Sequence, residues 1–343
     1  MQVAQNVSLA NYSTMRLGGQ AAYATAVSSQ QELIEALAWA RQQNVPVQMI
    51  GSGSNIVWRD EGFAGLLIVN KIMRFEVFEE DEQNVYVTVG SGENWDETVA
   101  RCVERSLTGI ESLSLIPGTT GATPVQNVGA YGQEIAQTLV SVEAFDMQSN
   151  SMVTIQGIDC KFGYRTSRFK TNDRGRFFIT AITLHLMKGN PQPPFYGALQ
   201  HYLDDHGFQT FTPQVVRNAV IAIRRAKLPD PSVVANNGSF FANPIITDAE
   251  FADIQMNYPD APHWPTSEPG KVKVPAAWLI EQAGFKDFHD GETGMATWPK
   301  QALVLVNENA KSTGDLITFM TKLTSAVKTK FNVDLQPEPE LLP

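Results

Sequence analysis

The stretch Pro117–Gly132 (PGTTGATPVQNVGAYG) constrains the fold more than any other part of the chain. It contains four glycines and two prolines, and no residue in it carries a charge. Glycine reaches backbone conformations that other residues avoid, and proline fixes the path of the chain. Such a run either brings backbone N–H groups close to a ligand, commonly a phosphate, or forms a tightly turned, buried loop between two strands. This stretch alone leaves both interpretations open.

Length and composition indicate an ordinary folded protein. The chain has 343 residues, which predicts two or three domains, with 43% hydrophobic and 18% charged residues. It has no apolar run long enough to span a membrane, and its first residues lack the basic start and apolar core of a signal peptide. Cys102 and Cys160 lie far apart without a CxxC context, so neither a disulfide framework nor a structural zinc site is expected. We therefore expect a cytoplasmic protein.

The charge balance argues against nucleic acid as a partner. The net charge is −10, whereas nucleic-acid affinity depends on basic surface. A local exception is the basic cluster of Arg217, Arg224, Arg225 and Lys227. It is either a solvated helix face or a site for an anionic small molecule, and the sequence leaves both open.

The first half is rich in predicted strands. A helix is expected over 28–43, because Ser29 and Glu32 have capping-box spacing and Leu33, Ile34, Leu37 and Ala40 recur on one face. A buried strand, 45–50, leads into a second small-residue turn, GSGSN (51–55), and Asn94 is a plausible N-cap for a helix that runs to about 105. Further strands are expected over 66–69, 85–89 and 177–186, with a hairpin formed by 139–147 and 152–155.

The second half has more predicted helices. Helices are expected over 197–205, from Thr212-Pro213 to about 226, from Thr247 onward with Phe251, Ile254 and Met256 among its apolar positions, over 275–283, and over 312–330. A strand is expected over 302–307. Pro229 and Pro231 suggest an inter-domain crossing, and the tail QPEPELLP reads as extended, with no ordered role evident from its composition.

Two resemblances to known families limit the range of possible functions. The two small-residue turns resemble the flavin-binding domain of vanillyl-alcohol-oxidase-type enzymes. Five further segments resemble the UDP-N-acetylenolpyruvoylglucosamine reductase family, over nearly the whole chain and in order: CKFGYRTSRFK (160–170), RRAKLPDP (224–231), NNGSFFANP (236–244), PAAWLIEQAG (275–284) and QALVLVN (301–307). The insertion between Gly175 and Lys227 is similar to the longer of the two family types, in which a tyrosine loop covers the substrate.

The resemblance implies a fold and a domain organisation. The fold class would be α+β, with a PCMH-type FAD-binding domain over 1–225, made of two α/β subdomains (about 1–70 and 71–225). A smaller α+β substrate domain would cover 226–343, with the tail returning to the active site. The implied enzyme is a cytoplasmic, FAD-dependent UDP-N-acetylmuramate dehydrogenase of bacterial cell-wall synthesis.

The resemblance also implies the chemistry. NADPH reduces non-covalently bound FAD, which then reduces the enolpyruvyl ether of a UDP-sugar to a lactyl ether. Ser239 matches the proton donor and Arg165 the catalytic arginine. Glu338 matches the third catalytic residue, but Pro339 and Glu340 follow where the family usually has a hydrophobic residue and arginine, so Glu340 is an alternative. Taken alone, these residues could equally be a turn cap, a surface arginine and a solvated carboxylate.

The remaining implied contacts fall into two groups. The expected FAD-binding residues are Gly51, Ser52, Gly53, Ser54, Asn55, Pro117, Gly118, Gly121, Gln126, Asn127, Gly129 and Ala130. The expected substrate-binding residues are Tyr131, Tyr164, Tyr196, Lys227, Asn243 and Gln301. No metal, membrane or nucleic acid is implied, and a monomer is expected. Trp298 stands where many relatives are expected to have histidine. The alternatives are a flavin oxidase or dehydrogenase of a hydroxy acid or sugar, and a non-catalytic flavin-binding protein.

Overall fold

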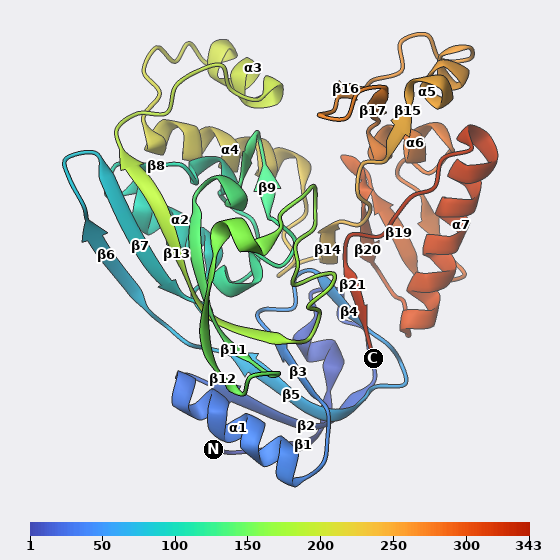
Figure 1. Ribbon diagram of the computed structural model, residues 1–343. Coiled ribbons are helices and arrows are strands. Elements are labelled where there is room, and N and C mark those ends of the chain that lie inside the picture. The colour runs from blue at the N-terminus through green and yellow to red at the C-terminus, as the bar shows by residue number, and fades with distance from the viewer. The chain divides into compact units, whose positions relative to one another are not determined.

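The computed structural model describes residues 1–343, except for the side chain of Glu79. The chain divides into two compact units (Figure 1). The first unit comprises Met1–Val7, Ala21–Ser52 and Phe63–Ala226, and the second comprises Ser8–Gln20, Gly53–Gly62 and Lys227–Pro343. The predicted domains, divided at residues 225 and 226, stay a prediction. Among the described residues, none of the helices combines the length and the apolarity that crossing a membrane requires.

A four-stranded sheet opens the first unit. Its order is β1 (Ala4–Ser8), β2 (Gln20–Val27), β5 (Phe63–Asn70) and β3 (Val47–Ile50), and β2, β5 and β3 are parallel. Helix α1 (Gln30–Gln42) begins after Ser29, whose hydroxyl accepts the N–H of Glu32, so the predicted cap is confirmed. Its buried face carries Leu33, Ala36, Leu37 and Ala40. Ile34, predicted on that face, is 37% exposed.

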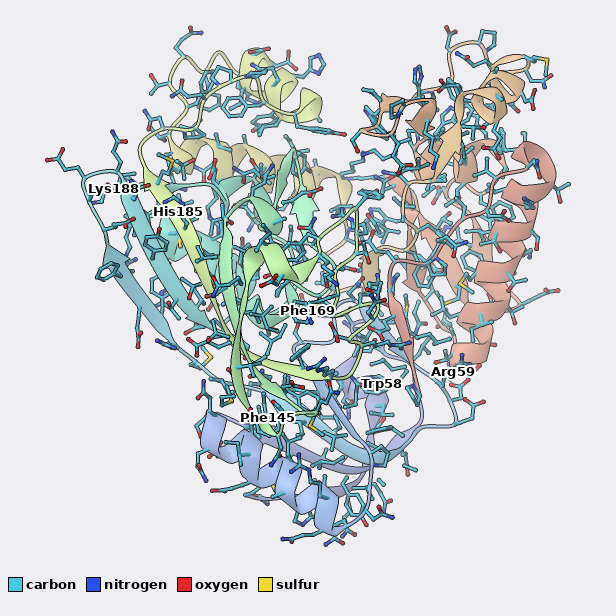
Figure 2. The ribbon with its side chains drawn as sticks, in the orientation of Figure 1. Trp58, Arg59, Phe145, Phe169, His185 and Lys188 are labelled. Atoms are coloured by element: carbon cyan, nitrogen blue, oxygen red, sulfur yellow. The ribbon has the colours of Figure 1, made fainter. Side chains whose placement is uncertain are left out.

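An antiparallel sheet forms the rest of this unit. Its order is β12 (Ser151–Gln156), β11 (Leu139–Asp146), β13 (Phe177–Lys188), β7 (Asn84–Gly90) and β6 (Phe75–Glu79), with β8 (Leu107–Thr108) beside β13. The predicted hairpin of β11 and β12 is confirmed, and so is helix α2 (Trp95–Val103) with its Asn94 cap. Phe145 of β11 packs with the α1 cluster, whereas Phe169 packs in the separate core of this sheet (Figure 2).

Two helices end the first unit. Helix α3 (Gly197–Asp205) coincides with its predicted range, and α4 (Pro213–Lys227) begins after Thr212, whose hydroxyl accepts the N–H of Val215. Leu199 and Leu203 of α3 form a small cluster with Val216 and Val220 of α4. The two helices therefore have an apolar core of their own.

The second unit contains two small antiparallel sheets. One has the order β14 (Ala235–Ser239), β20 (Gln301–Asn307), β19 (Met295–Trp298) and β18 (His289–Asp290), and the other β15 (Ile245–Thr247), β17 (Lys271–Lys273) and β16 (Trp264–Pro265). The helices are α5 (Asp248–Gln255), α6 (Ala276–Gln282) and α7 (Thr313–Phe331). The capping boxes at Thr247 and Ser312 confirm the predicted starts of α5 and α7. Met256, predicted on the apolar side of α5, follows that helix and is 75% exposed.

Helix α7 supplies much of the core of the second unit. Figure 1 shows it alongside β19 and β20, and its buried Phe319 and Leu323 share a cluster with Leu303 and Leu305 of β20. The same cluster contains Met15, Leu17 and Val57. The segments 8–20 and 53–62, far away in the sequence, therefore belong to this core.

The C-terminal tail is ordered. Strand β21 (Glu340–Leu342) pairs in parallel with β4 (Ile56–Trp58), so the extended conformation expected from its prolines has a definite partner. Neither strand was predicted, because a three-residue strand carries almost no periodic signal.

A carboxylate from another segment caps α7. Asp60 accepts the N–H of Thr313 through Oδ1 at 2.7 Å and that of Gly314 through Oδ2 at 2.9 Å, and the Thr313 hydroxyl donates to the carbonyl of Trp58 at 2.6 Å. The first N–H groups of a helix have no intrahelical acceptor and carry partial positive charge, so a carboxylate there is stabilising. This contact connects the segment 53–62 to the longest helix.

We predict that Asp60→Ala lowers the free energy of unfolding by about 1–2 kcal/mol, the usual cost of a lost helix cap. The measurement is urea denaturation followed by circular dichroism, with the neighbouring exposed Glu61→Ala as the matched control. Equal denaturation midpoints for the two variants would contradict the capping role of Asp60.

Candidate active site

The two small-residue turns contact each other within the first unit. A Cβ atom built on Gly51 would lie 2.0 Å from Oγ1 and 3.2 Å from Cβ of Thr119. Gly121 donates its N–H to the carbonyl of Ser91, and Thr120 donates to that of Glu93. Only glycine therefore allows the residue that follows β3 to lie so close to the Thr119 side chain. The uncharged backbone brought together here fits the pyrophosphate of FAD, which backbone N–H groups bind.

Asn127, expected to contact FAD, uses its side chain inside the protein. Nδ2 donates to Glu134 at 2.8 Å and to the carbonyl of Gly163 at 3.1 Å, while Oδ1 accepts the N–H of Ala136 at 3.1 Å. Asn127 is buried, with 2% of its surface exposed. Its side chain therefore holds the loop in shape, and a cofactor would meet the backbone here.

Arg165 lies at the tip of a two-residue turn. Gly163 and Thr166 exchange backbone hydrogen bonds of 3.1 and 3.2 Å, which leaves Tyr164 and Arg165 as the central pair. Arg165 has φ of +54°, a conformation that costs energy for a residue with a Cβ and that recurs at functional sites. A Cβ on Gly129 of β9 (Gly129–Ala130) would lie 3.3 Å from Nη1 of Arg165. The structure thus places the predicted catalytic arginine against the predicted flavin loop.

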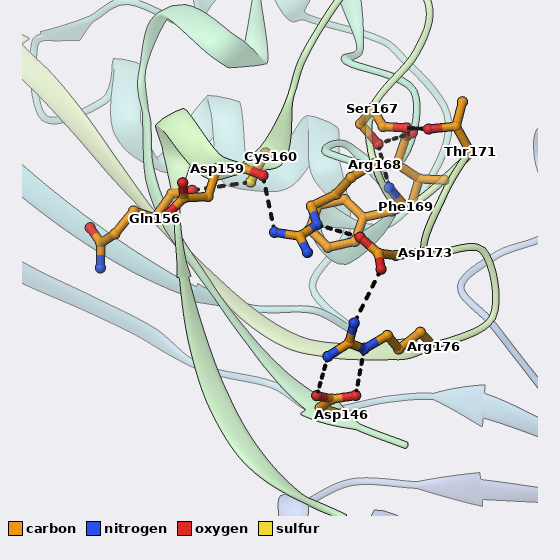
Figure 3. A network of polar contacts seen from close by, with 11 residues as sticks. Asp146, Gln156, Asp159, Cys160, Ser167, Arg168, Phe169, Thr171, Asp173 and Arg176 are labelled. Carbon is orange, nitrogen blue, oxygen red and sulfur yellow. Dashed lines mark hydrogen bonds and ion pairs between the residues drawn. The ribbon is translucent and has the colours of Figure 1, made fainter. Parts of the chain in front are cut away.

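A chain of ion pairs holds the loop that follows Arg165 (Figure 3). Arg168 pairs with Asp173 at 2.6 Å, Arg176 with the same carboxylate at 3.3 Å, and Arg176 with Asp146 of β11 at 2.8 Å. Hydrogen bonding from Arg176 holds the pKa of Asp146 well below its usual range. Arg168, three residues after Arg165, is therefore engaged within the protein.

The basic cluster of α4 divides into inward and outward members. Arg217 binds both oxygens of Asp96 at 2.6 and 3.0 Å, and Arg224 donates to the carbonyl of Leu115 at 3.2 Å. Arg225 and Lys227 are exposed. The solvated-face interpretation therefore holds for only part of the cluster.

Arg224 and Arg165 lie near enough to interact. Burial lowers the pKa of Arg224, and the charge of Arg165 acts in the same direction. The Tyr131 hydroxyl lies beside Arg224, and burial raises the pKa of Tyr131. Two positive charges and a buried hydroxyl in one place suit an anionic group such as a carboxylate or a phosphate.

Tyr196 lies in contact with Tyr131. Their rings meet edge to face at 6.1 Å, and Tyr196 is 43% exposed. Both line a cavity of about 300 Å³ whose other walls include Gln133, Glu111 and Phe195. The tyrosine expected to cover the substrate thus borders a cavity beside Tyr131.

In the second unit, Ser239 ends strand β14. The pairing of β14 with β20 shifts between Asn236 and Ser239, which marks a bulge that redirects the strand. Gly238, with φ of +69°, donates its N–H to Oδ1 of Asn236 at 2.8 Å. Phe240 and Phe241 are 3% and 1% exposed and belong to the core, so they anchor the strand immediately after Ser239.

Glu338 lies beside this strand. Its N–H donates to the carbonyl of Phe240 at 2.9 Å, and its own carbonyl accepts Nδ2 of Asn55 at 3.4 Å. Glu340 donates its N–H to the carbonyl of Asn55 at 3.0 Å. The tail therefore runs between the residue that follows Ser239 and the second half of the GSGSN turn, with Glu338 nearer to Ser239 along this path.

The other expected contacts have visible structural roles. Asn243 accepts the N–H of Ala276 at 2.9 Å and so caps α6, and Gln301 begins β20. Trp298 donates to the carbonyl of Lys227 at 3.1 Å and packs against Val304 and Val306. That contact gives the unexpected tryptophan a structural role at the end of α4.

Several residues that make these contacts were not predicted from the sequence. Thr119 and Glu134 contact the predicted site residues Gly51 and Asn127, and Asp96 pairs with Arg217 of the basic cluster. Thr14 and Asn237 contact the GSGSN turn. Asn237 stands inside the NNGSFFANP segment, so its place in a matched motif was the one available signal. Thr119 lies inside the Pro117–Gly132 stretch, whereas Glu134, Asp96 and Thr14 lie outside every matched segment.

The chain resembles known proteins over its whole length. A model of an FAD binding domain matches residues 21–155, and a model of the C-terminal domain of UDP-N-acetylenolpyruvoylglucosamine reductase matches residues 230–342. The reductase of Chromobacterium violaceum is 36% identical over 343 residues, covering 100% of this chain and 99% of that protein. The chain belongs to the UDP-N-acetylenolpyruvoylglucosamine reductase family.

Other members agree with this placement. The reductase of Alcanivorax borkumensis is 41% identical over 298 residues, covering 87% of this chain and 84% of that protein. The crystal structure of the reductase from Thermus caldophilus has a TM-score of 0.69 at 21% identity, covering 100% of both chains. The reductase family membership and the predicted α+β class, with a PCMH-type FAD domain and a C-terminal domain, are therefore confirmed.

We predict that Gly51→Ala reduces FAD content and lowers the stability of the first unit by about 1–3 kcal/mol, the usual cost of overpacking. Thr119→Ala removes the nearest atom of the clash, so the double variant should recover most of the loss. The measurements are the ratio of flavin to protein absorbance and the urea denaturation midpoint. Additive losses in the double variant would contradict the contact.

We predict that Asp146→Asn destabilises the protein at pH 7 by about 1–3 kcal/mol, because it breaks a hydrogen-bonded ion pair. The native pKa of Asp146 lies below the unfolded value of about 4, so the carboxylate stabilises the fold above that pH and loses this effect as the pH falls. The difference from wild type should therefore shrink below about pH 4. Urea denaturation at several pH values measures it, with exposed Asp253→Asn as control; a pH-independent difference would contradict the argument.

Proposed function

We propose that this protein uses NADPH to reduce the enolpyruvyl ether of UDP-N-acetylglucosamine enolpyruvate, forming UDP-N-acetylmuramate for peptidoglycan precursors. One observation carries the proposal: within the second unit, residues 54–56, at and just after the end of GSGSN, hydrogen-bond both to the strand that carries Ser239 and to the tail that carries Glu338. Membership of the reductase family supports the same activity. A flavin oxidase would explain the two turns but not the NNGSFFANP and RRAKLPDP segments.

The cofactor supplies one part of the chemistry. When bound, FAD carries the hydride from NADPH to one carbon of the substrate alkene. Gly51, Thr119 and the segments around them would lie along its pyrophosphate, because neither GSGSN nor Pro117–Gly121 carries an acidic side chain that would repel it. Residues 117–130, with the backbone at Gln126, Asn127, Gly129 and Ala130, would line the remainder. Binding without a covalent link stays a prediction.

Ser239 would supply the proton. Reduction of the alkene adds a hydride at one carbon and a proton at its neighbour, so NADPH is oxidised as the C=C bond is saturated. The Ser239 hydroxyl donates that proton and is left as an alkoxide, to be reprotonated by solvent or a nearby acid. The bulge at Gly238 and the anchored Phe240 and Phe241 hold the hydroxyl in place on a rigid strand.

Arg165 would stabilise the developing charge. Hydride addition next to a carboxylate-bearing carbon moves negative charge onto that carboxylate, and a planar, permanently charged guanidinium binds it best. The strained turn at Tyr164 and Arg165 presents this group, and Arg224 adds a second positive charge nearby. We assign the substrate carboxylate to this pair.

Glu338 is the better assignment of the tail carboxylate. Its backbone bonds to Phe240, the residue directly after Ser239, whereas Glu340 pairs with Asn55 at the start of β21. Glu338 would reprotonate Ser239 or stabilise the enol form of the substrate. Tyr131, Tyr164, Tyr196, Lys227, Asn243 and Gln301 remain the proposed substrate contacts. A monomer working in the cytoplasm also stays a prediction.

An anaerobic two-step titration tests the function. NADPH should bleach the flavin absorbance near 450 nm, and UDP-N-acetylglucosamine enolpyruvate should then restore it with formation of UDP-N-acetylmuramate. Bleaching without restoration by this substrate would overturn the proposal and favour a different flavoenzyme.

We predict that Ser239→Ala leaves flavin reduction by NADPH within about twofold of wild type and slows reoxidation by substrate at least about 10³-fold, since only the second half-reaction needs the proton. Stopped-flow absorbance resolves the two halves. Exposed Ser325→Ala, on α7, should change neither. Equal slowing of both halves in Ser239→Ala would rule out its role as the donor.

A further inference from the structure

Asn237 connects the strand of the proposed proton donor to the GSGSN segment. Its Nδ2 donates to Oγ1 of Thr14 at 3.0 Å and to the carbonyls of Ser54 and Ile56, each at 3.2 Å. Asn237 stands two residues before Ser239 and is 6% exposed. One buried amide group thus meets three acceptors from two separate segments.

The orientation of this amide follows from its partners. Two of the three acceptors are backbone carbonyls, which can only accept, so the amide nitrogen must face them. A flipped amide would place its oxygen against two other oxygens. The buried position excludes water from these bonds, so their loss is not compensated by solvent.

The backbone around Asn237 reinforces the link. Asn236 donates its N–H to the carbonyl of Thr14 at 3.1 Å, and Thr14 donates to that of Gly53 at 3.1 Å. The segment at Thr14 therefore lies between the strand of Ser239 and the turn. A displacement of residues 53–56 would therefore disturb Asn237 directly, through Ser54 and Ile56, and indirectly, through Thr14.

The oxygen of the same amide has an unusual environment. Oδ1 of Asn237 is buried and has no hydrogen-bond partner among the described residues. A buried acceptor without a donor costs about 1–3 kcal/mol, so natural proteins rarely keep one without a reason. The amide nevertheless keeps this orientation, so its Nδ2 bonds to the carbonyls of Ser54 and Ile56 outweigh the cost of the unpaired oxygen.

We propose that Asn237 is a positioning residue that couples FAD binding at residues 53–56 to the placement of the Ser239 hydroxyl. This inference rests on the proposed function. When FAD holds the turn, the three hydrogen bonds of Nδ2 fix the strand, and Ser239 takes its productive position. Asn237 itself neither gives nor takes a proton.

The test compares both half-reactions and FAD binding in Asn237→Ala. Flavin reduction by NADPH should stay within about twofold of wild type, whereas reoxidation by UDP-N-acetylglucosamine enolpyruvate should slow at least about tenfold, the effect of about 1.4 kcal/mol. Titration of the apoprotein with FAD, followed by flavin fluorescence, should show binding weakened by about tenfold.

A double-mutant cycle separates positioning from general damage. In the Ser239→Ala background, Asn237→Ala should slow reoxidation less than about twofold further, because the group it positions is gone. Multiplicative slowing in the double variant would overturn the proposal. Equal slowing of both half-reactions in Asn237→Ala would do the same.

Two further variants keep the test decisive. Thr14→Val removes an acceptor of the same amide while preserving shape, and should show the same selective slowing if Asn237→Ala does not fold. Asn307→Ala is the matched control: Asn307 donates to the carbonyl of Met15 at 3.1 Å in the same segment, and among the described residues its side chain does not bond to residues 53–56. A selective effect of Asn307→Ala would overturn the proposal.

The wild-type titration distinguishes failure of the proposed function from failure of the positioning role of Asn237. If the wild-type flavin is not reoxidised by the enolpyruvyl substrate, the proposed function fails. If the wild type is reoxidised and Asn237→Ala behaves like the control, only the positioning role fails.

Discussion

The arrangement of the second unit depends on the backbone of residues 53–58. This short segment bonds to the tail through Asn55 and β21, to the strand of Ser239 through Asn237, and to Thr14 through Gly53. Asp60, just beyond it, caps α7. Because each partner comes from a different part of the chain, loss of this segment would release the proposed proton donor, the tail carboxylate and the longest helix together.

In the first unit, several arginines form ion pairs within the protein. Arg217, Arg168 and Arg176 are neutralised by Asp96, Asp173 and Asp146, and these ion pairs shape the surrounding loops. Arg165 and Arg224 remain close to one another beside uncharged, glycine-rich backbone. The ion-paired arginines stabilise the surrounding loops, whereas Arg165 and Arg224 bring two positive charges close together.

Much of the secondary structure was predictable because its signals are local. Ser29, Asn94, Thr247 and Ser312 each cap the helix that the sequence predicts, and the β11–β12 hairpin follows from a short turn between two apolar runs. The strands β4, β14 and β21 were missed because they are short and their partners lie far away in the sequence. Ile34 and Met256 were wrongly predicted to be buried, because the spacing of apolar residues does not show where a helix ends or which segments pack against it.

The sequence by itself determined the family, the flavin chemistry and the candidate residues, because each was carried by contiguous segments such as NNGSFFANP. Only the tertiary structure decided how those residues are used. The Asn127 side chain stabilises its own loop, Arg217 forms an ion pair, and the Glu338 backbone bonds to Phe240, the residue after Ser239. The physical reason is that hydrogen-bond partners and burial depend on segments far apart in the chain, and no local pattern encodes which of these segments will meet.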